Sequence, residues 1–351
     1  MDFKRRKTRK IKVGNTFLGG DSSIKTQSML NLPAEDIRGS VAQAEALERA
    51  GCEIIRTAVP DMKSVALIEA LKNAVVIPVV ADIHFDYRLA LAAVDAGADK
   101  IRINPGNIGD DGRIKAVADK CRGAGVPIRI GVNSGSVEKE LLKKYGGPTP
   151  EALAMSAIKN AKLLEKFDFN DIVISIKSSD VRNTYAANIE VAKMCDYPLH
   201  LGVTEAGTEL SSAIKSSAAL GGLLLSGIGD TVRISITGDP VREVVCAKEL
   251  LKSLGLKKGG VTFVSCPTCG RTKIDLVSLA NAVEQKLCGC DKNVKVAVMG
   301  CVVNGPGEAK EADIGVAGGD GCGVIFRKGE IIKKVPEDRL LPELLSEIDK
   351  L

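Results

Sequence analysis

The sequence has 351 residues, enough for two domains, and its content of 45% hydrophobic and 26% charged residues is typical of a folded globular protein. Aromatic residues make up only 3% and tryptophan is absent, which argues against stacking on bases or sugars as the main binding mode. The net charge of +5 is spread along the chain. A basic run at residues 4–10 is better explained by a solvated terminus than by a contact with nucleic acid or phosphate.

The sequence also argues against a membrane location. No apolar stretch approaches the roughly 20 residues of a membrane-spanning helix, and no hydrophobic signal region follows the basic start. The ten cysteines are therefore expected to be thiols or metal ligands rather than disulfides. We expect a cytoplasmic protein that binds neither nucleic acid nor a membrane.

From residue 24 onward, short runs rich in Val and Ile alternate with helical patterns, as in parallel βα units. Gly51 and Gly97 follow the expected helices 40–50 and 88–96, where glycine ends a helix cheaply. Eight units in about 240 residues predict an α/β fold, a (β/α)8 TIM barrel, with an open doubly wound sheet as the alternative. The expected strands are residues 24–28, 53–57, 77–82, 100–104, 127–132, 171–177, 198–203 and 231–236.

A change of pattern near residue 257 predicts a domain boundary. A last barrel helix is expected at 239–254, and residues 255–260 form a linker rich in Gly and Lys. We therefore expect a TIM-barrel substrate-binding domain over residues 1–257 and a small α+β domain over residues 258–351. In the small domain, strands are expected at 261–264, 294–299, 313–317, 322–327 and 330–335, and helices at 274–287 and 337–350.

Polar residues stand at the end of nearly every expected barrel strand, where the strands of a βα barrel converge on the ligand site. Any one of them alone is better explained as a loop residue or a member of a buried ion pair, but their convergence on one barrel mouth predicts a binding site. They are Arg56, Asp82, His84, Arg102, Asn104, Arg129, Asn133, Lys177, His200, Thr204, Glu205, Arg233 and Ser235.

The side-chain types in this group predict an anionic ligand. Arg and Lys side chains around one cavity repel each other unless an anion compensates them, and planar guanidinium groups suit phosphate oxygens. A glycine-rich turn at residues 102–109 offers backbone N–H groups as well. A diphosphate is the expected ligand. Asp82, His84 and Glu205 are candidates for acid–base or hydroxyl-binding roles, and a purely structural role is an equal alternative for His84.

A second group of residues predicts a metal centre. Cys266 and Cys269 form a C-x-x-C pair, and Cys301 follows about thirty residues later. This spacing fits a cubane iron–sulfur cluster better than zinc, which normally needs a second pair, or a redox dithiol, which needs no third cysteine. The candidates for the fourth ligand are Glu308, Cys288, Cys290 and Cys322. Packing as small apolar side chains better explains Cys52, Cys121, Cys195 and Cys246.

Longer motifs are similar to those of one enzyme family. Cys-Pro-Thr-Cys-Gly-Arg begins at Cys266 and Cys-Val-Val-Asn-Gly-Pro-Gly-Glu-Ala at Cys301. In this combination the sequence resembles the 4-hydroxy-3-methylbut-2-enyl diphosphate synthases, the iron–sulfur enzymes of the methylerythritol phosphate route to isoprenoids. Leu30 departs from the family pattern, in which a small polar residue is more usual. Further matching motifs begin at Gln27, Ala81, Arg102, Arg129, His200 and Gly227.

The resemblance implies a barrel joined to a [4Fe-4S] domain in a head-to-tail homodimer. It implies reductive ring opening and dehydroxylation of 2-C-methyl-D-erythritol 2,4-cyclodiphosphate to 1-hydroxy-2-methyl-2-(E)-butenyl 4-diphosphate, with electrons from flavodoxin or ferredoxin. The implied cluster ligands are Cys266, Cys269, Cys301 and Glu308, and Glu308 would yield to a substrate oxygen. The implied diphosphate contacts are Arg56, Arg102, Arg129, Asn133, Lys177 and Ser235, with Thr204 and Glu205 near the reacting carbons.

A different class of protein is the competing hypothesis. An aldolase-type barrel that binds a phosphosugar, with a zinc-stabilised accessory domain, would also present cations at the barrel mouth. In that case Lys177 is the expected Schiff-base residue.

Overall fold

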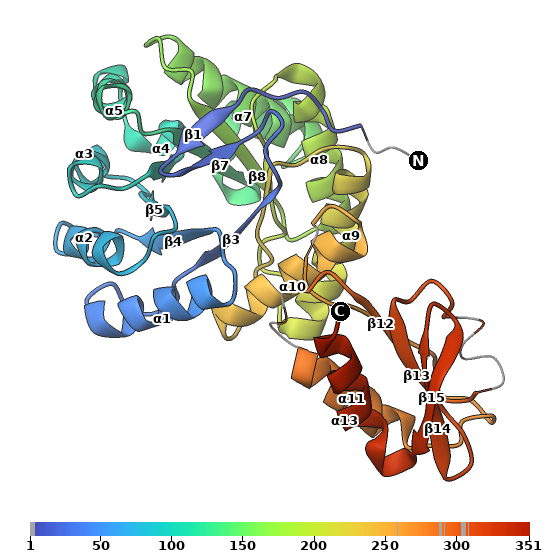
Figure 1. Cartoon of the computed structure of the whole chain (residues 1–351). Coiled ribbons are helices and arrows are strands. Elements are labelled where there is room, and N and C mark those ends of the chain that lie inside the picture. Colours follow the sequence, from blue (N-terminus) through green and yellow to red (C-terminus); the bar gives the residue numbers. More distant parts are fainter. Residues whose placement is uncertain (1–3, 258, 288–289, 291, 303–306, 308) are drawn as a thin grey trace. The chain divides into compact units, whose positions relative to one another are not determined.

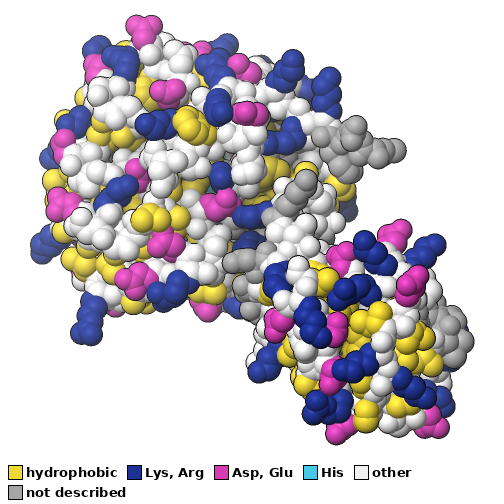
Figure 2. All heavy atoms as spheres, viewed as in Figure 1, with side chains coloured by type: hydrophobic (Ala, Val, Ile, Leu, Met, Phe, Trp, Pro, Cys, Tyr) yellow, Lys and Arg dark blue, Asp and Glu magenta, His cyan; other side chains and the backbone are white. Residues whose placement is uncertain are grey.

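The computed structural model describes residues 4–257, 259–287, 290, 292–302, 307 and 309–351. The chain divides into two compact units, Met1–Leu256 and Lys257–Leu351 (Figure 1). On the visible face of each unit, Lys and Arg side chains are interspersed with Asp and Glu (Figure 2). Within the described residues, no helix combines the length and apolar character of a bilayer-spanning segment.

The first unit is a barrel of parallel strands. Its eight-stranded sheet has the order β8-β7-β6-β5-β4-β3-β10-β9, and a bridge from Ile174 to Leu199 brings β9 back beside β8. Because the order follows the chain without the reversal of a doubly wound sheet, the TIM-barrel prediction is confirmed and the doubly wound alternative is wrong. The strands are β3 (Lys25–Met29), β4 (Ile54–Ala58), β5 (Val79–Asp82), β6 (Lys100–Ile103), β7 (Ile128–Asn133), β8 (Ile172–Lys177), β9 (His200–Leu201) and β10 (Thr231–Val232).

At least one helix follows each barrel strand. Aspartates cap several of them; the Asp86 carboxylate, for example, accepts from the backbone N–H of Arg88 over 3.0 Å. Gly51 and Gly97 end two helices with φ values of 88° and 89°, which only glycine adopts without strain. The helices are α1 (Ile37–Arg49), α2 (Val65–Ala74), α3 (Tyr87–Asp95), α4 (Pro105–Ile108), α5 (Asp111–Ala124), η1 (Ser134–Ser136), α6 (Lys139–Tyr145), α7 (Pro150–Glu165), α8 (Val181–Met194), α9 (Glu209–Leu225) and α10 (Pro240–Ser253).

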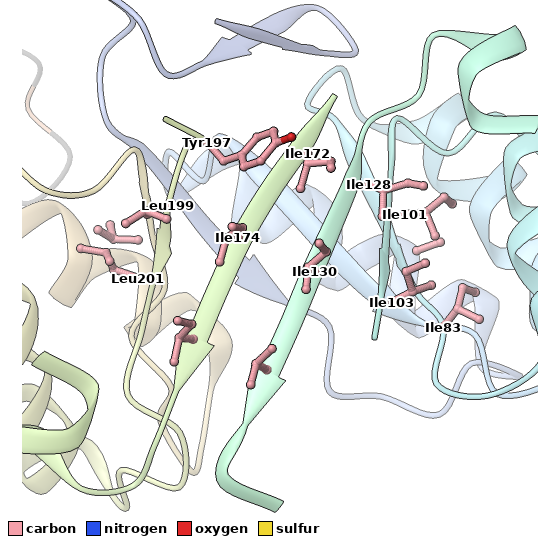
Figure 3. Packing of buried hydrophobic residues seen from close by; sticks show 14 of the residues in the cluster. Ile83, Ile101, Ile103, Ile128, Ile130, Ile172, Ile174, Tyr197, Leu199 and Leu201 are labelled. Carbon is pink, nitrogen blue, oxygen red and sulfur yellow. The ribbon is translucent and has the colours of Figure 1, made fainter. Parts of the chain in front are cut away.

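The outward faces of the strands carry the main hydrophobic core. Figure 3 shows Ile128 and Ile130 on β7 beside Ile172 and Ile174 on β8, and all four are fully buried. Since side chains alternate along a strand, the residues between these isoleucines point into the barrel. The interior is thus built from a separate set of side chains.

The inward side chains form layers, and each layer takes its side chains from alternate strands. The pairing registers of the strands show which residues share a layer. Bulky aliphatic residues usually fill such layers. Here the layers become more polar towards the carboxyl-terminal ends of the strands, so the interior itself leads to a polar site. The lowest layer holds Ile54, Lys100, Val173 and Thr231; the next holds Gln27, Val80, Arg129 and His200; and the third holds Arg56, Arg102, Ser175 and Arg233.

A short hairpin, which the sequence did not reveal, closes the opposite end of the barrel. It consists of β1 (Ile11–Val13) and β2 (Thr16–Leu18), paired antiparallel. The fully buried side chains of Ile11, Val13 and Leu18 form one cluster with Ile54, Val80 and Val173 of the barrel interior. This apolar plug leaves the carboxyl-terminal mouth as the polar end.

The basic residues that precede the hairpin are folded against the barrel. Nη2 of Arg5 lies 2.8 Å from Oδ1 of Asp230, and Arg6 donates to backbone carbonyls that include that of Cys195. The explanation of this run as a solvated terminus is therefore wrong for these two arginines.

The second unit is a mixed sheet covered by helices, which confirms the predicted α+β architecture. The sheet has the order β11-β12-β13-β14-β15, with parallel pairing from β11 to β13 and antiparallel pairing beyond. Its core includes Val296, Val316 and Leu344, all fully buried. The elements are β11 (Thr262–Ser265), α11 (Leu276–Leu287), β12 (Lys295–Met299), β13 (Ile314–Gly318), β14 (Cys322–Arg327), β15 (Glu330–Pro336), η2 (Glu337–Arg339) and α13 (Leu340–Asp349).

Candidate active site

A cavity of about 120 Å³ lies at the carboxyl-terminal ends of the barrel strands. Most of the polar residues predicted at the strand ends line it, so the structure brings them together. The lining residues are Arg56, Asp82, His84, Arg102, Arg129, Gly131, Asn133, Ser175, Lys177, Thr204, Arg233 and Ser235.

Asp82 is the carboxylate around which the cations of this cavity gather. Its Oδ1 lies 3.1 Å from Nη1 of Arg102, and its Oδ2 lies 3.6 Å from Nε of Arg56 and 3.4 Å from Nε2 of His84. Burial opposes ionisation of Asp82, but the positive charge of Arg56 and the hydrogen bond of His84 outweigh it. Together with Arg102 they hold the pKa of this carboxyl well below its usual range. Asp82 is therefore an anion that orients two guanidinium groups.

Positive charge exceeds negative charge around the cavity. Burial, reinforced by the nearby arginines, lowers the pKa values of Arg129 and Lys177 well below their ordinary values. Burial also lowers the pKa of Arg56, to about 10. The carboxylates that act on these cations are Asp82 and Glu243. An anionic ligand would relieve the remaining repulsion, and the guanidinium groups match phosphate oxygens.

Two glycines make room for these cations, although the sequence analysis had not included them among the site residues. A Cβ on Gly131 would stand 2.3 Å from Nε of Arg102, and one on Gly202 would stand 2.7 Å from Nζ of Lys177. The sequence does contain a signal for Gly131, because it lies between the β-branched residues Ile130 and Val132 of a strand. A glycine inside a strand often marks a place where another group comes close to the backbone. Arg233 and Ser175 also line the cavity but were not among the implied ligand contacts.

Three predicted site residues do not line the cavity. Asn104 caps helix α4, where its Oδ1 accepts from the N–H of Gly106 over 3.1 Å. His200 lies deeper in the barrel, with Nδ1 2.8 Å from Oγ1 of Thr231. Glu205 is exposed beside Thr204 and has a φ of 52°, an unusual conformation for a bulky residue.

In the second unit, two of the predicted cluster ligands follow neighbouring parallel strands. Cys266 comes directly after β11, and Cys301 comes two residues after β12. The backbone N–H of Gly300 donates to Sγ of Cys266 over 3.2 Å, and that of Lys273 donates to the Gly300 carbonyl over 3.1 Å. These bonds tie the C-x-x-C loop to the segment that carries Cys301.

The third thiol, Cys269, is exposed on that loop. Hydrogen bonds from the backbone and side chain of Arg271, with a further one from Thr272, lower the pKa of Cys269. The thiolate is the form that binds metal, so this environment suits a ligand. A cavity of about 390 Å³ lies beside Cys301. Its lining consists of Gly270, Arg271, Lys273, Cys301, Val302, Gly318, Gly319 and Asp320.

The predicted cysteine ligands, Cys266, Cys269 and Cys301, carry the thiol groups that bind the irons of iron–sulfur clusters. Within the described residues, no three His, Cys, Asp or Glu side chains are grouped closely enough to hold a single metal ion. Cluster ligands bind separate irons and so stand further apart than the ligands of one ion. The predicted fourth ligand, Glu308, lies outside the described residues, as does its competitor Cys288.

The cysteines of the first unit have a different character. Burial raises the pKa of Cys52 and of Cys121 to about 12, so both remain protonated thiols. Burial also raises the pKa values of Cys195 and Cys246. Cys52 and Cys121 belong to the buried core of the barrel unit, and Cys195 and Cys246 are partly buried against it, so all four are suited to packing.

Fold and site together define a class of protein: a TIM barrel with a cation-rich mouth, joined to a small thiol-bearing α+β unit. Comparison with known families is more specific. The model of the GcpE TIM-barrel domain matches residues 8–248 and that of the GcpE protein C-terminal domain matches residues 262–350, so this chain belongs to the GcpE family.

Individual relatives are similar over nearly their whole length. A protein of Clostridium perfringens is 56% identical over 347 residues, 99% of each chain, and one of Caldanaerobacter subterraneus is 57% identical over 99% of this chain and 98% of its own. Both are named 4-hydroxy-3-methylbut-2-en-1-yl diphosphate synthase (flavodoxin). The resemblance drawn from the motifs is thereby confirmed. These relatives favour a redox enzyme over the aldolase-type alternative.

Solved structures are similar in the barrel fold alone. Dihydropteroate synthase from Stenotrophomonas maltophilia aligns with a TM-score of 0.53 at 16% identity, covering 71% of this chain and 98% of its own. The enzyme from Xanthomonas albilineans aligns with a TM-score of 0.51 at 14% identity, covering 70% and 98%.

Proposed function

We propose that this chain catalyses the reductive ring opening and dehydroxylation of 2-C-methyl-D-erythritol 2,4-cyclodiphosphate to 1-hydroxy-2-methyl-2-(E)-butenyl 4-diphosphate. The chain is then an oxidoreductase of isoprenoid precursor synthesis. The reaction breaks the carbon–oxygen bond that closes the ring and removes one hydroxyl as water. Its balance requires two electrons and two protons. The names of the relatives support this assignment.

The observation that carries the proposal is the excess of cations at the barrel mouth. The cyclic substrate holds its diphosphate within the ring, so a site that fixes the diphosphate also fixes the bond to be broken. In our proposal Arg56, Arg102 and Arg129 bind the phosphoryl oxygens, and Lys177, Asn133 and Ser235 complete the contacts. Their place on the lining of one cavity supports these roles.

The remaining polar residues are proposed to handle the carbon end of the substrate. Asp82 and His84, which lie 3.4 Å apart, are placed to accept from and donate to hydroxyl groups. Thr204 lines the cavity, and the neighbouring Glu205 has a strained backbone conformation of the kind that is common at active sites. We assign Glu205 to proton transfer near the reacting carbons.

We propose that the second unit holds a [4Fe-4S] cluster through Cys266, Cys269, Cys301 and Glu308. When bound, such a cluster would supply the two electrons one at a time, and Glu308 would be its weak, exchangeable protein ligand. The N–H donation to Cys266 and the lowered pKa of Cys269 support the cysteine assignments. The electron donor is flavodoxin, as in the relatives' names, or ferredoxin.

We further propose a head-to-tail homodimer in which the second unit of one subunit covers the barrel mouth of the other. Two exposed apolar side chains in segments that follow the barrel strands support this, because a covering unit would remove them from water. Met62 is 59% exposed and Phe85 is 70% exposed, in the segments after β4 and β5. A cytoplasmic location suits the described cysteines, all of which are free.

The test is an anaerobic reaction of purified protein with the cyclic diphosphate and chemically reduced flavodoxin, followed by mass spectrometry. We expect the linear hydroxybutenyl diphosphate. Intact cyclic substrate after incubation with protein that carries its full iron content would overturn the proposed function.

A further inference from the structure

We propose that Glu243 is a positioning residue that fixes Arg233 and Ser235 at the diphosphate site. The inference rests on the proposed function, because it concerns how that site is held. Arg233 and Ser235 come from the segment that begins with β10, and Glu243 lies in the first turn of the helix that follows, α10.

Glu243 uses both carboxylate oxygens in four hydrogen bonds. Its Oε2 accepts from Nε of Arg233 over 3.0 Å and from Oγ of Ser28 over 2.8 Å. Its Oε1 accepts from Nη2 of Arg233 over 2.8 Å and from the backbone N–H of Ile236 over 3.1 Å. The residue is only 2% exposed, so water cannot replace these bonds easily.

The two bonds to Arg233 form a bidentate pair, which fixes the plane of the guanidinium group. The side chain of Arg233 is 16% exposed and lines the cavity. Its Nη1 lies 3.8 Å from Sδ of Met29, a weak acceptor. The donors that Glu243 does not occupy therefore remain for the anion.

The same carboxylate fixes the backbone next to Ser235. Its bond to the N–H of Ile236 holds the peptide that follows Ser235, and the carbonyl of Ser235 accepts from Oγ of Ser212 over 2.7 Å. Ser235 is thus held from two helices, α9 and α10. Its own side chain lines the cavity.

Glutamine cannot replace glutamate in this arrangement. An amide offers one accepting oxygen, and each carboxylate oxygen of Glu243 accepts from an N–H of Arg233. In either orientation the NH₂ group of glutamine would therefore face a guanidinium N–H. In Glu243→Gln the guanidinium loses its bidentate partner, while the side-chain volume is almost unchanged. The substitution therefore separates orientation of Arg233 from the space that the side chain fills.

The experiment is calorimetric titration of anaerobically purified, iron-loaded protein with inorganic diphosphate. We expect Glu243→Gln to raise the Kd about tenfold or more, the effect of one charge-assisted contact. Glu249→Gln is the matched control, since Glu249 lies exposed on the same helix, and its Kd should equal that of the wild type. An unchanged Kd in Glu243→Gln would overturn the inference.

A double-mutant cycle shows whether Glu243 acts through Arg233. In an Arg233→Met background, adding Glu243→Gln should raise the diphosphate Kd by less than about tenfold, because only the effect through Ser235 is left to lose. An undiminished tenfold loss would contradict the inference. If Glu243→Gln does not fold, the paired variant Glu243→Met with Arg233→Met leaves no orphan charge. Its diphosphate Kd should exceed that of Arg233→Met alone by less than about tenfold, and a larger further loss would contradict the inference. Failure of the wild type to bind diphosphate would instead count against the proposed function.

Discussion

Gly131 lies so close to Arg102 that any side chain there would displace the guanidinium group. A Cβ on Gly131 would come within 2.3 Å of Nε and 2.6 Å of Nη2. Arg102 is held on its other side by the carboxylate of Asp82, 3.1 Å from Nη1. The position of this arginine is therefore set by one ion pair and by one missing side chain.

Gly131→Ala should move Arg102 and weaken substrate binding. We expect the KM and the Kd for inorganic diphosphate to rise about tenfold, the effect of losing one charged hydrogen bond, with a smaller change in kcat. Gly135→Ala is the control, because a Cβ there meets nothing within 4 Å. Equal diphosphate affinity in the two variants would show that Arg102 does not contact the anion.

Asp82→Asn should destabilise the empty protein and make it more responsive to anions. Removing a buried carboxylate leaves Arg56 and Arg102 without their counter-charge, a change that typically costs about 3 to 5 kcal/mol. Diphosphate supplies negative charge at the same place, so it should raise the Tm of Asp82→Asn by more than it raises that of the wild type. Calorimetric scans with and without diphosphate measure both effects. Identical Tm increments would contradict this role for Asp82.

Lys100→Met should stabilise the barrel, most strongly at low pH. Burial, with repulsion from Arg129 and Arg56 and a smaller opposing effect of Asp99, lowers the pKa of Lys100 well below that of an unfolded chain. At a pH between the pKa of Lys100 in the folded protein and its pKa in the unfolded chain, the unfolded chain binds one proton more than the folded protein. The free energy of unfolding therefore rises with pH, by up to about 1.4 kcal/mol per pH unit. The side chain is fully buried, and its Nζ has no hydrogen-bond partner among the described residues.

Measuring Tm at several pH values tests this prediction for Lys100→Met. Methionine fills a similar volume without a charge, so the Tm advantage of Lys100→Met over the wild type should shrink as the pH rises from 7 towards 10. A variant that is less stable than the wild type, or an advantage that does not change with pH, would contradict the prediction.

Cys266→Ala should abolish cluster assembly. Sγ of Cys266 accepts a hydrogen bond from the backbone N–H of Gly300, and Cys266 belongs to the proposed ligand set. We therefore expect the iron content of Cys266→Ala, purified anaerobically, to fall to background. Cys246→Ala provides the comparison, because Cys246 lies partly buried in the barrel unit and should leave the iron content unchanged. Full iron content in Cys266→Ala would remove this residue from the ligand set.

The positions of the barrel strands could be predicted because strand and helix patterns alternate along the chain and helices end at glycines such as Gly51. The expected strands 198–203 and 231–236 were too long, since β9 and β10 have two residues each. The hairpin that closes the barrel could not be predicted, since Ile11–Val13 and Thr16–Leu18 are too short to show a period. Its apolar contacts with Val80 and Val173 arise only once the barrel has formed.

The side of the barrel on which the site lies followed from the strand ends, but the depth and direction of each side chain did not. Asn104 and His200 were expected at strand ends with the other site residues. Asn104 instead caps helix α4, and His200 is the first residue of β9, where its ring contacts Thr231. The part played by Glu243 was also hidden, because it sits on a helix and acts through Arg233 rather than from a strand end.

The central claim is that the cations of the barrel and the thiols of the second unit serve one two-electron reduction. Its most direct test is the number of electrons taken from reduced flavodoxin for each molecule of product, measured anaerobically by absorbance and mass spectrometry on the same sample. We expect two electrons per linear diphosphate formed. Product formation without consumption of reductant would contradict the claim.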